Sequence, residues 1–130
     1  MATIRKSVLI DIPPERAWDA IRDVGNLHVR LFPHMLSDTV LEGDERIVTF
    51  ADGRSVRETI VTVDDGEMRV AYAIIGGALR HYAAAVEVTP KNERSLVQWT
   101  VDLLPNEAAE RISRVMDGGL ADMKSTLEAF

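Results

Sequence analysis

Few residues of this chain combine a chemically useful type with a position that suits chemistry. Glu58 and Arg46 lie in neighbouring strand-like runs and would pair inside the fold if both pointed inward. Tyr82, Tyr72 and Trp99 lie in three further runs, each among alternating apolar residues. A desolvated Glu58 would suit a general base, and Tyr82 a proton donor or an oxyanion donor. These residues form the candidate site, provided that the strands direct them into one space.

Other catalytic and metal-binding arrangements find little support. The chain has no cysteine, which excludes disulfides, thiol nucleophiles and cysteine metal sites. His28 and His34 are six residues apart, which is not a helical ligand spacing, and His81 lies on the opposite strand face from Tyr82. We therefore expect no metal site. Because phosphate-loop and dinucleotide motifs are absent, we expect no cofactor.

The composition indicates an ordinary globular protein. A chain of 130 residues, 46% apolar and 28% charged, predicts one domain over residues 1–130. The net charge of −6 argues against a nucleic-acid partner, which would need clustered Lys and Arg. No apolar run approaches the ~18 residues of a membrane span, and no signal-peptide pattern is present. We therefore expect a cytoplasmic protein that does not insert into membranes.

The first half of the chain alternates short strands and short helices. Residues 3–11 alternate apolar and polar positions and predict a half-buried strand, which the following prolines end. Residues 15–24 then predict a short helix, and 27–31 another helical turn. Residues 35–43 and 46–52 predict a strand pair.

The second half shows strand-like runs in succession and then one long helix. The runs cover residues 56–64, 67–75, 80–88 and 95–103, and they predict a curved antiparallel meander. After Pro105 the apolar period changes to 3.6, with Asn106 as a candidate N-cap. The apolar stripe of this helix consists of Ile112, Val115, Met116, Gly119, Leu120, Met123, Leu127 and Phe130. Gly118 and Gly119 each cost roughly 1 kcal/mol in a helix, so we expect either a close neighbour or a bend there.

Strand alternation assigns faces to most runs. Tyr82, Tyr72 and Trp99 belong to the apolar, inward sets of their runs. The run 56–64 is ambiguous, because either Glu58 or Val61 could lie on its inward face. An inward Glu58 would need a partner such as Arg46, since an unpaired buried carboxylate is costly.

The order of these segments resembles a known superfamily. SVLIDIPPERAWDAIRDVGNL, DGRSVRETIVTVDD and the stretch from Tyr82 through Trp99 to the terminal helix resemble START-like (Bet v 1-like, SRPBCC) proteins, specifically the bacterial polyketide cyclase/dehydrase branch. The resemblance implies an α+β helix-grip fold. In this fold a curved seven-stranded antiparallel sheet wraps around a long C-terminal helix, and two short helices follow the first strand. It also implies an internal cavity for a small hydrophobic molecule.

The stretch SVRETIVTVDDGEMRVAYAIIGGALRHY also resembles the plant abscisic-acid receptors. The similarity implies an inward Glu58, and it matches Arg46, Tyr72, Tyr82, Ala84 and Trp99 to pocket positions, with residues 76–80 at the pocket mouth. Leu36 stands near the position of the receptor lysine that anchors the hormone carboxylate, and residues 51–55 lack the gate-loop proline. We therefore expect no hormone sensing by that mechanism.

Three hypotheses follow for the function. The first is a binding protein for a lipid, polyketide or isoprenoid-like molecule. The second is a polyketide cyclase or aromatase with Glu58 and Tyr82 as catalytic candidates. The third is a partner-binding module, with a homodimer through an edge strand or through Leu27 to Phe32. The expected ligand-binding residues are Arg46, Val48, Phe50, Glu58, Ile60, Tyr72, Ile74, Tyr82, Ala84, Trp99, Met116, Leu120 and Met123.

Overall fold

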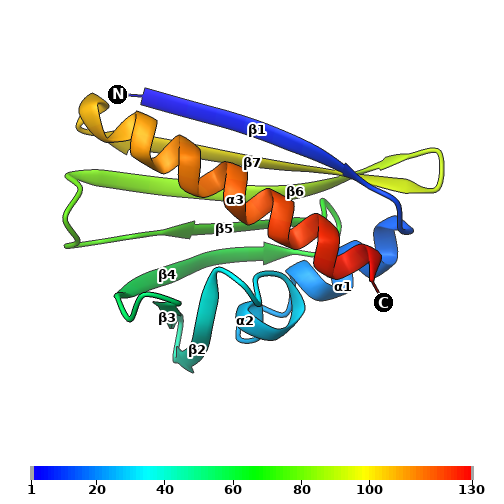
Figure 1. The fold of residues 1–130 in the computed structure, drawn as a ribbon, viewed down its shortest axis with the longest axis horizontal. Coiled ribbons are helices and arrows are strands. Elements are labelled where there is room, and N and C mark those ends of the chain that lie inside the picture. Colours follow the sequence, from blue (N-terminus) through cyan, green and yellow to red (C-terminus); the bar gives the residue numbers. More distant parts are fainter. Residues whose placement is uncertain (1, 130) are drawn as a thin grey trace.

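A long helix packed against an antiparallel sheet dominates the structure, a computed structural model that describes residues 2–129 (Figure 1). The predicted helix end at Phe130 lies outside these residues. The elements are β1 (Ala2–Ile10), α1 (Pro14–Ile21), α2 (Leu27–Arg30), β2 (Leu36–Glu42), β3 (Glu45–Phe50), β4 (Ser55–Asp64), β5 (Arg69–Ala73), β6 (His81–Lys91), β7 (Arg94–Leu104), a 3-10 turn (Asn106–Ala108) and α3 (Ala109–Glu128). Within residues 2–129, no helix is long and apolar enough to span a bilayer.

The sheet confirms the predicted helix-grip architecture. Its seven strands are all antiparallel, in the order β1-β7-β6-β5-β4-β3-β2, so only β1 pairs out of sequence order. The helix α3 runs across one face of this curved sheet, and α1 and α2 lie near its C-terminal half (Figure 1). The inner face of the sheet is therefore covered by α3, with α1 and α2 at one end of it.

Two local predictions are wrong. Residues 67–75 form a shorter strand than expected, because Met68 has a φ of +50° and belongs to the turn before β5. Asn106 is not the N-cap of the last helix. It begins the 3-10 turn instead, and Ala108 occupies the N-cap position of α3 without a side-chain hydrogen bond.

A β-bulge explains why the run 56–64 was ambiguous. The register of β4 against β5 shifts between Ile60 and Thr62. Before this point the inward residues include Glu58, whereas after it Val63 packs against the core and Val61 is 64% exposed. Because a bulge adds a residue to one strand, it reverses the alternation that a simple pattern assumes. Residues from both alternating sets of this run therefore point inward, Glu58 from one set and Val63 from the other.

Close packing accounts for the glycine pair in α3. A Cβ atom added at Gly119 would lie 3.0 Å from Cζ3 of Trp99 and 3.5 Å from the Met35 thioether. A Cβ at Gly118 would meet nothing within 4 Å. Of the two expected reasons for these glycines, a close neighbour therefore applies at Gly119 alone.

This difference predicts opposite effects of substitution at the two glycines. We expect Gly118→Ala to raise the free energy of unfolding by up to about 1 kcal/mol, because alanine is the better helix former. We expect Gly119→Leu to lower it by about 1–3 kcal/mol, because the side chain would overpack the space against Trp99. Urea denaturation measures both changes. A neutral or stabilising Gly119→Leu would contradict the close contact.

Candidate functional site

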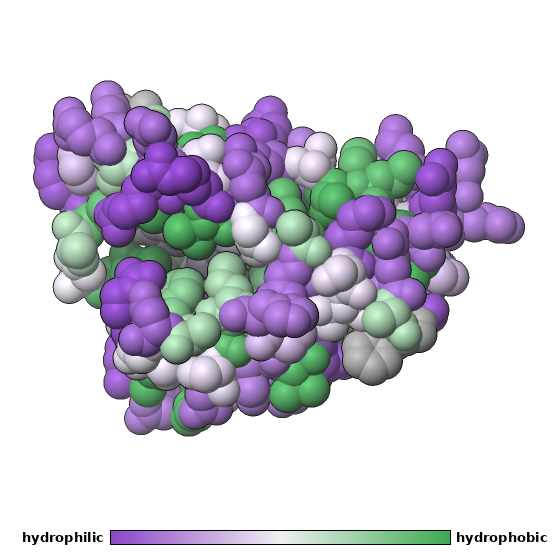
Figure 2. Space-filling model, in the orientation of Figure 1, coloured by the Kyte–Doolittle hydropathy of each residue, from purple (hydrophilic) through white to green (hydrophobic). Residues whose placement is uncertain are grey.

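A cavity of about 80 Å³ lies between the sheet, α3 and the segment that contains α2. It opens on the face where α3 crosses the sheet, and Figure 2 shows a hollow on this face with apolar residues in its walls. The residues around it are mostly aliphatic, aromatic or thioether side chains. They are Ile21, Leu27, Leu31, Phe32, Met35, Leu36, Arg46, Val48, Phe50, Glu58, Val70, Tyr72, Tyr82, Val86, Trp99, Val115 and Met123.

One ion pair supplies the charges in this wall. Arg46 and Glu58 face each other across β3 and β4, and Nε of Arg46 donates a hydrogen bond of 2.6 Å to Oε1 of Glu58. Arg46 also donates from Nη1 to the Val24 carbonyl at 3.3 Å, and its guanidinium lies 4.8 Å from the centre of the Tyr72 ring. The arginine side chain is only 4% exposed. Such a pair balances its own charge, which lets both groups remain buried.

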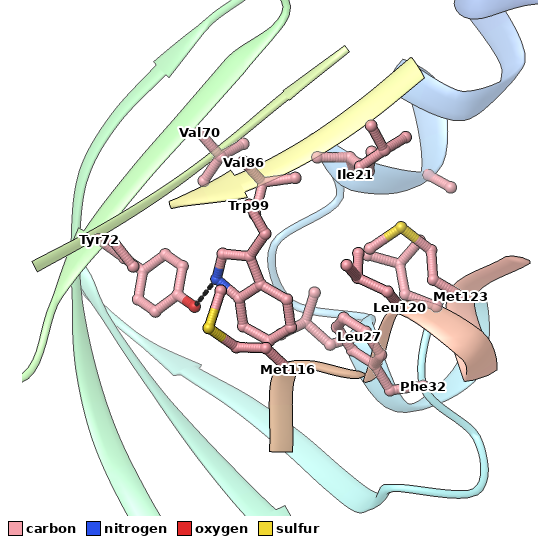
Figure 3. Packing of buried hydrophobic residues seen from close by; sticks show 14 of the residues in the cluster. Ile21, Leu27, Phe32, Val70, Tyr72, Val86, Trp99, Met116, Leu120 and Met123 are labelled. Atoms are coloured by element: carbon pink, nitrogen blue, oxygen red, sulfur yellow. Dashed lines mark hydrogen bonds between the residues drawn. The ribbon is translucent and has the colours of Figure 1, made fainter. Parts of the chain in front are cut away.

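The other polar groups in the cavity wall belong to aromatic side chains. The Trp99 Nε1 donates to the Tyr72 hydroxyl at 3.1 Å (Figure 3), and the Tyr72 and Tyr82 rings lie 6.2 Å apart. Burial raises the pKa of Tyr72 well above its usual value. Burial, and then the charge of Glu58, raise the pKa of Tyr82 to about 12. Both phenols therefore stay protonated at neutral pH and act as hydrogen-bond donors rather than as bases.

The structure brings together part of the predicted set. Arg46, Val48, Phe50, Glu58, Tyr72, Tyr82, Trp99 and Met123 line the cavity. Ala84, Met116 and Leu120 are buried in the core beside it, whereas Ile60 and Ile74 are half-buried and pack on the core. These five residues lie outside the lining. Their side chains face the inner side of the sheet, but most of that side is filled by other side chains, and only part of it borders the cavity. Leu36 is buried and lines the cavity.

Sequence reasoning missed most of the wall that the α2 segment provides. Ile21, Leu27, Leu31, Phe32 and Met35 line the cavity from α1, α2 and the connection to β2. Their apolar spacing is the one signal in the sequence. Leu27, Leu31 and Phe32 are buried, whereas Val29 of the same segment is 57% exposed, so a homodimer through this segment stays a prediction. A homodimer through the edge strand β2 stays a prediction.

A carboxylate on α3 holds one part of this wall in place. Asp122 is 7% exposed and accepts hydrogen bonds from the backbone N–H groups of His34 and Met35, at 2.9 and 3.0 Å. The backbone N–H of Ala51 donates to the Met35 carbonyl at 3.0 Å. The Met35 side chain is thereby positioned between Gly119 and the cavity. Sequence reasoning missed this contact, although Asp122 is a polar residue within the apolar stripe of the helix.

Comparison with protein families decides the assignment. Residues 1–128 match the family described as polyketide cyclase / dehydrase and lipid transport. The chain belongs to this family. The match confirms the predicted branch of the START-like, or SRPBCC, superfamily. Comparison with curated protein sequences gives no match.

Solved structures show the same fold for this polyketide cyclase/dehydrase family member. An uncharacterised protein from Bacillus thuringiensis is 20% identical, with a TM-score of 0.86 over 97% of this chain and 98% of that one. Norcoclaurine synthase from Thalictrum flavum, as a point mutant with a transition-state analogue, is 16% identical, with a TM-score of 0.74 over 98% and 92%. Ara h 8.0201 is 18% identical, with a TM-score of 0.77 over 99% of both chains. At these identities the likeness establishes the Bet v 1-like fold alone.

Proposed function

We propose that this protein binds a small, mainly apolar organic molecule, such as a lipid, polyketide or isoprenoid-like compound, between the sheet and α3. The observation that carries the proposal is an apolar-walled cavity whose charged residues, Arg46 and Glu58, neutralise each other. Pockets of this kind bind through apolar contact, and a few polar groups orient the ligand. The Tyr72 and Tyr82 hydroxyls would serve as those polar groups.

The size of the cavity limits the ligand. A volume of about 80 Å³ compares with roughly 30 Å³ per water molecule in the liquid, so the ligand-free site takes a few waters. Pockets for drug-sized ligands measure roughly 300–1,000 Å³. A larger ligand must therefore displace side chains. Met35 and Met123 line the cavity, and methionine adapts to new shapes at little cost.

Filling the cavity tests this proposal. We expect Val86→Phe to weaken the binding of 1-octanol at least tenfold, because the ring would occupy the space that the alkyl chain needs. The matched control is Val61→Phe, the same substitution on the outer face of β4, where Val61 is 64% exposed. Isothermal titration calorimetry measures both affinities. Native mass spectrometry after gentle purification would identify the natural ligand.

Two results would contradict the binding function. One is that wild-type protein binds neither octanol nor any member of a hydrophobic ligand set. The other is that Val86→Phe binds octanol as tightly as Val61→Phe does, although both variants are folded by circular dichroism.

A cyclase or aromatase activity is the second candidate. It is favoured by the position of Glu58 and Tyr82 on the wall of the same cavity. Against it, Oε1 of Glu58 already accepts a hydrogen bond of 2.6 Å from Nε of Arg46, so a substrate proton would have to compete with this donor for the oxygen. Tyr82, with a pKa of about 12, would serve only as a hydrogen-bond donor to a developing oxyanion. Binding without turnover therefore accounts for more of the site.

A further inference from the structure

Charge inside the cavity is already balanced. The Arg46 guanidinium is bound by Glu58 and by the Val24 carbonyl, and a buried ion would need a partner that this interior does not offer. A ligand with an ionised head group would therefore keep that group out of the interior. Its apolar part alone would enter.

Two exposed arginines, Arg80 and Arg111, lie close in the chain to residues that line the cavity. Figure 1 places the β5–β6 connection and the first turns of α3 at the same end of the molecule, and the hollow in Figure 2 lies toward this end. Arg111 is exposed on α3, one turn before the lining residue Val115. Arg80 is exposed at the end of the β5–β6 connection, two residues before the lining residue Tyr82. Strongly hydrophilic residues flank the hollow on two sides in Figure 2.

Neither of these arginines is committed to another group. Among residues 2–129, the side chains of Arg80 and Arg111 form no ion pair and no hydrogen bond. The neighbouring carboxylate of Glu110 is bound by Arg114 at 3.1 Å. The sequence contains no acidic residue from 68 to 86, so the β5–β6 connection adds no negative charge. Two guanidinium groups thus remain available for an anion.

The β5–β6 connection also carries an exposed apolar side chain. Ile75 in the β5–β6 connection is 78% exposed, the largest exposure among the large apolar side chains of residues 2–129. Gly76 beside it has a φ of +75°, and nothing lies within 4 Å of a Cβ added there. This end of the molecule thus carries an exposed apolar side chain and two free cationic groups, which suits a molecule with an alkyl chain and an anionic end.

We propose that the ligand of this site is an anionic amphiphile, such as a medium-chain carboxylic acid, whose alkyl tail fills the cavity while its carboxylate is bound by Arg80 and Arg111. This inference rests on the proposed binding function and names its ligand class. The two guanidinium groups provide charge-assisted hydrogen bonds, which are about twice as strong as neutral ones. Electrostatic attraction at a partly exposed rim also makes the binding sensitive to salt.

Octanoate and 1-octanol test this head-group preference, because they share one chain length. At neutral pH we expect octanoate to bind wild-type protein on the order of tenfold more tightly than octanol, equal to about 1.4 kcal/mol. In Arg80→Gln/Arg111→Gln, octanoate should lose this advantage, while the octanol affinity should change less than twofold. The control Arg5→Gln/Arg94→Gln removes the same charge from two exposed arginines on the outer face of β1 and at the β6–β7 hairpin. It should leave both affinities unchanged.

Tryptophan fluorescence tests the orientation of the ligand. Trp99 lines the cavity, whereas the other tryptophan, Trp18, is bound to Asp65 outside the lining. Octanoate with bromine on its terminal carbon should quench Trp99 strongly, and octanoate with bromine beside the carboxylate should quench it weakly. Stronger quenching by the second compound would overturn the tail-in arrangement.

The outcomes separate this inference from the binding function. Octanol binding without any octanoate preference, or an octanoate affinity unchanged in Arg80→Gln/Arg111→Gln, overturns the anionic head group and leaves the binding function standing. If wild-type protein binds neither compound, both proposals fail.

Discussion

Removal of either charge of the buried pair is expected to lower the free energy of unfolding by about 3–5 kcal/mol. Arg46→Met would leave the Glu58 carboxylate buried without a cationic partner. Glu58→Leu would leave the Arg46 guanidinium buried without an anionic partner. The pair is joined at 2.6 Å, and both side chains are almost inaccessible to water. Because domains are stable by only about 5–15 kcal/mol, either loss would be a large share of the total.

The double variant Arg46→Met/Glu58→Leu should be more stable than either single variant, because no charge then remains unpaired in the cavity. Arg57→Met is a matched control. Arg57 precedes Glu58 on β4 and pairs with Glu45 of β3, but on the outer face, where its side chain is 51% exposed. We expect it to change stability little. Urea denaturation measures the free energy of unfolding of each variant. A double variant that is less stable than both single variants would contradict the proposed cost of an unpaired buried charge.

The second large effect is expected at Trp99, because its indole fills the space between β7 and α3. We expect Trp99→Ala to lower the free energy of unfolding by about 3–5 kcal/mol, through lost burial and a new cavity. Loss of the hydrogen bond from Nε1 to Tyr72 adds to this cost. A Cβ atom added at Gly119 would lie only 3.0 Å from Cζ3 of this indole, so the ring packs closely against α3.

Rescue by free indole would show that the cost comes from the missing ring. A cavity left in an otherwise intact core binds a ligand of matching shape and is stabilised by it. We expect indole to raise the melting temperature of Trp99→Ala and to leave that of wild type nearly unchanged. If Trp99→Ala fails to fold, the same indole experiment is carried out with Trp99→Leu. Equal responses of wild type and variant to indole would count against a cavity formed by this substitution.

The sequence by itself determined the architecture, because strand and helix periods are local properties of the chain. Alternation in β6 and β7 placed Tyr82 and Trp99 on the buried face, and the change of period after Pro105 located α3. The strand-like runs also gave the number of strands, and the family resemblance added the grip of the sheet on the helix. Local patterns suffice at these positions because each of these runs is regular from one end to the other.

Only the tertiary structure decided where the alternation of β4 reverses and how far the cavity extends. The bulge after Ile60 breaks the alternation of β4, and no residue type in that run marks where it occurs. Likewise, the wall from Leu27 to Met35 is positioned by Asp122, a residue 87 positions away from Met35 in the chain. The space left between packed side chains depends on how distant segments meet. A periodic pattern therefore predicts which residues face inward, whereas packing determines which of them border a gap.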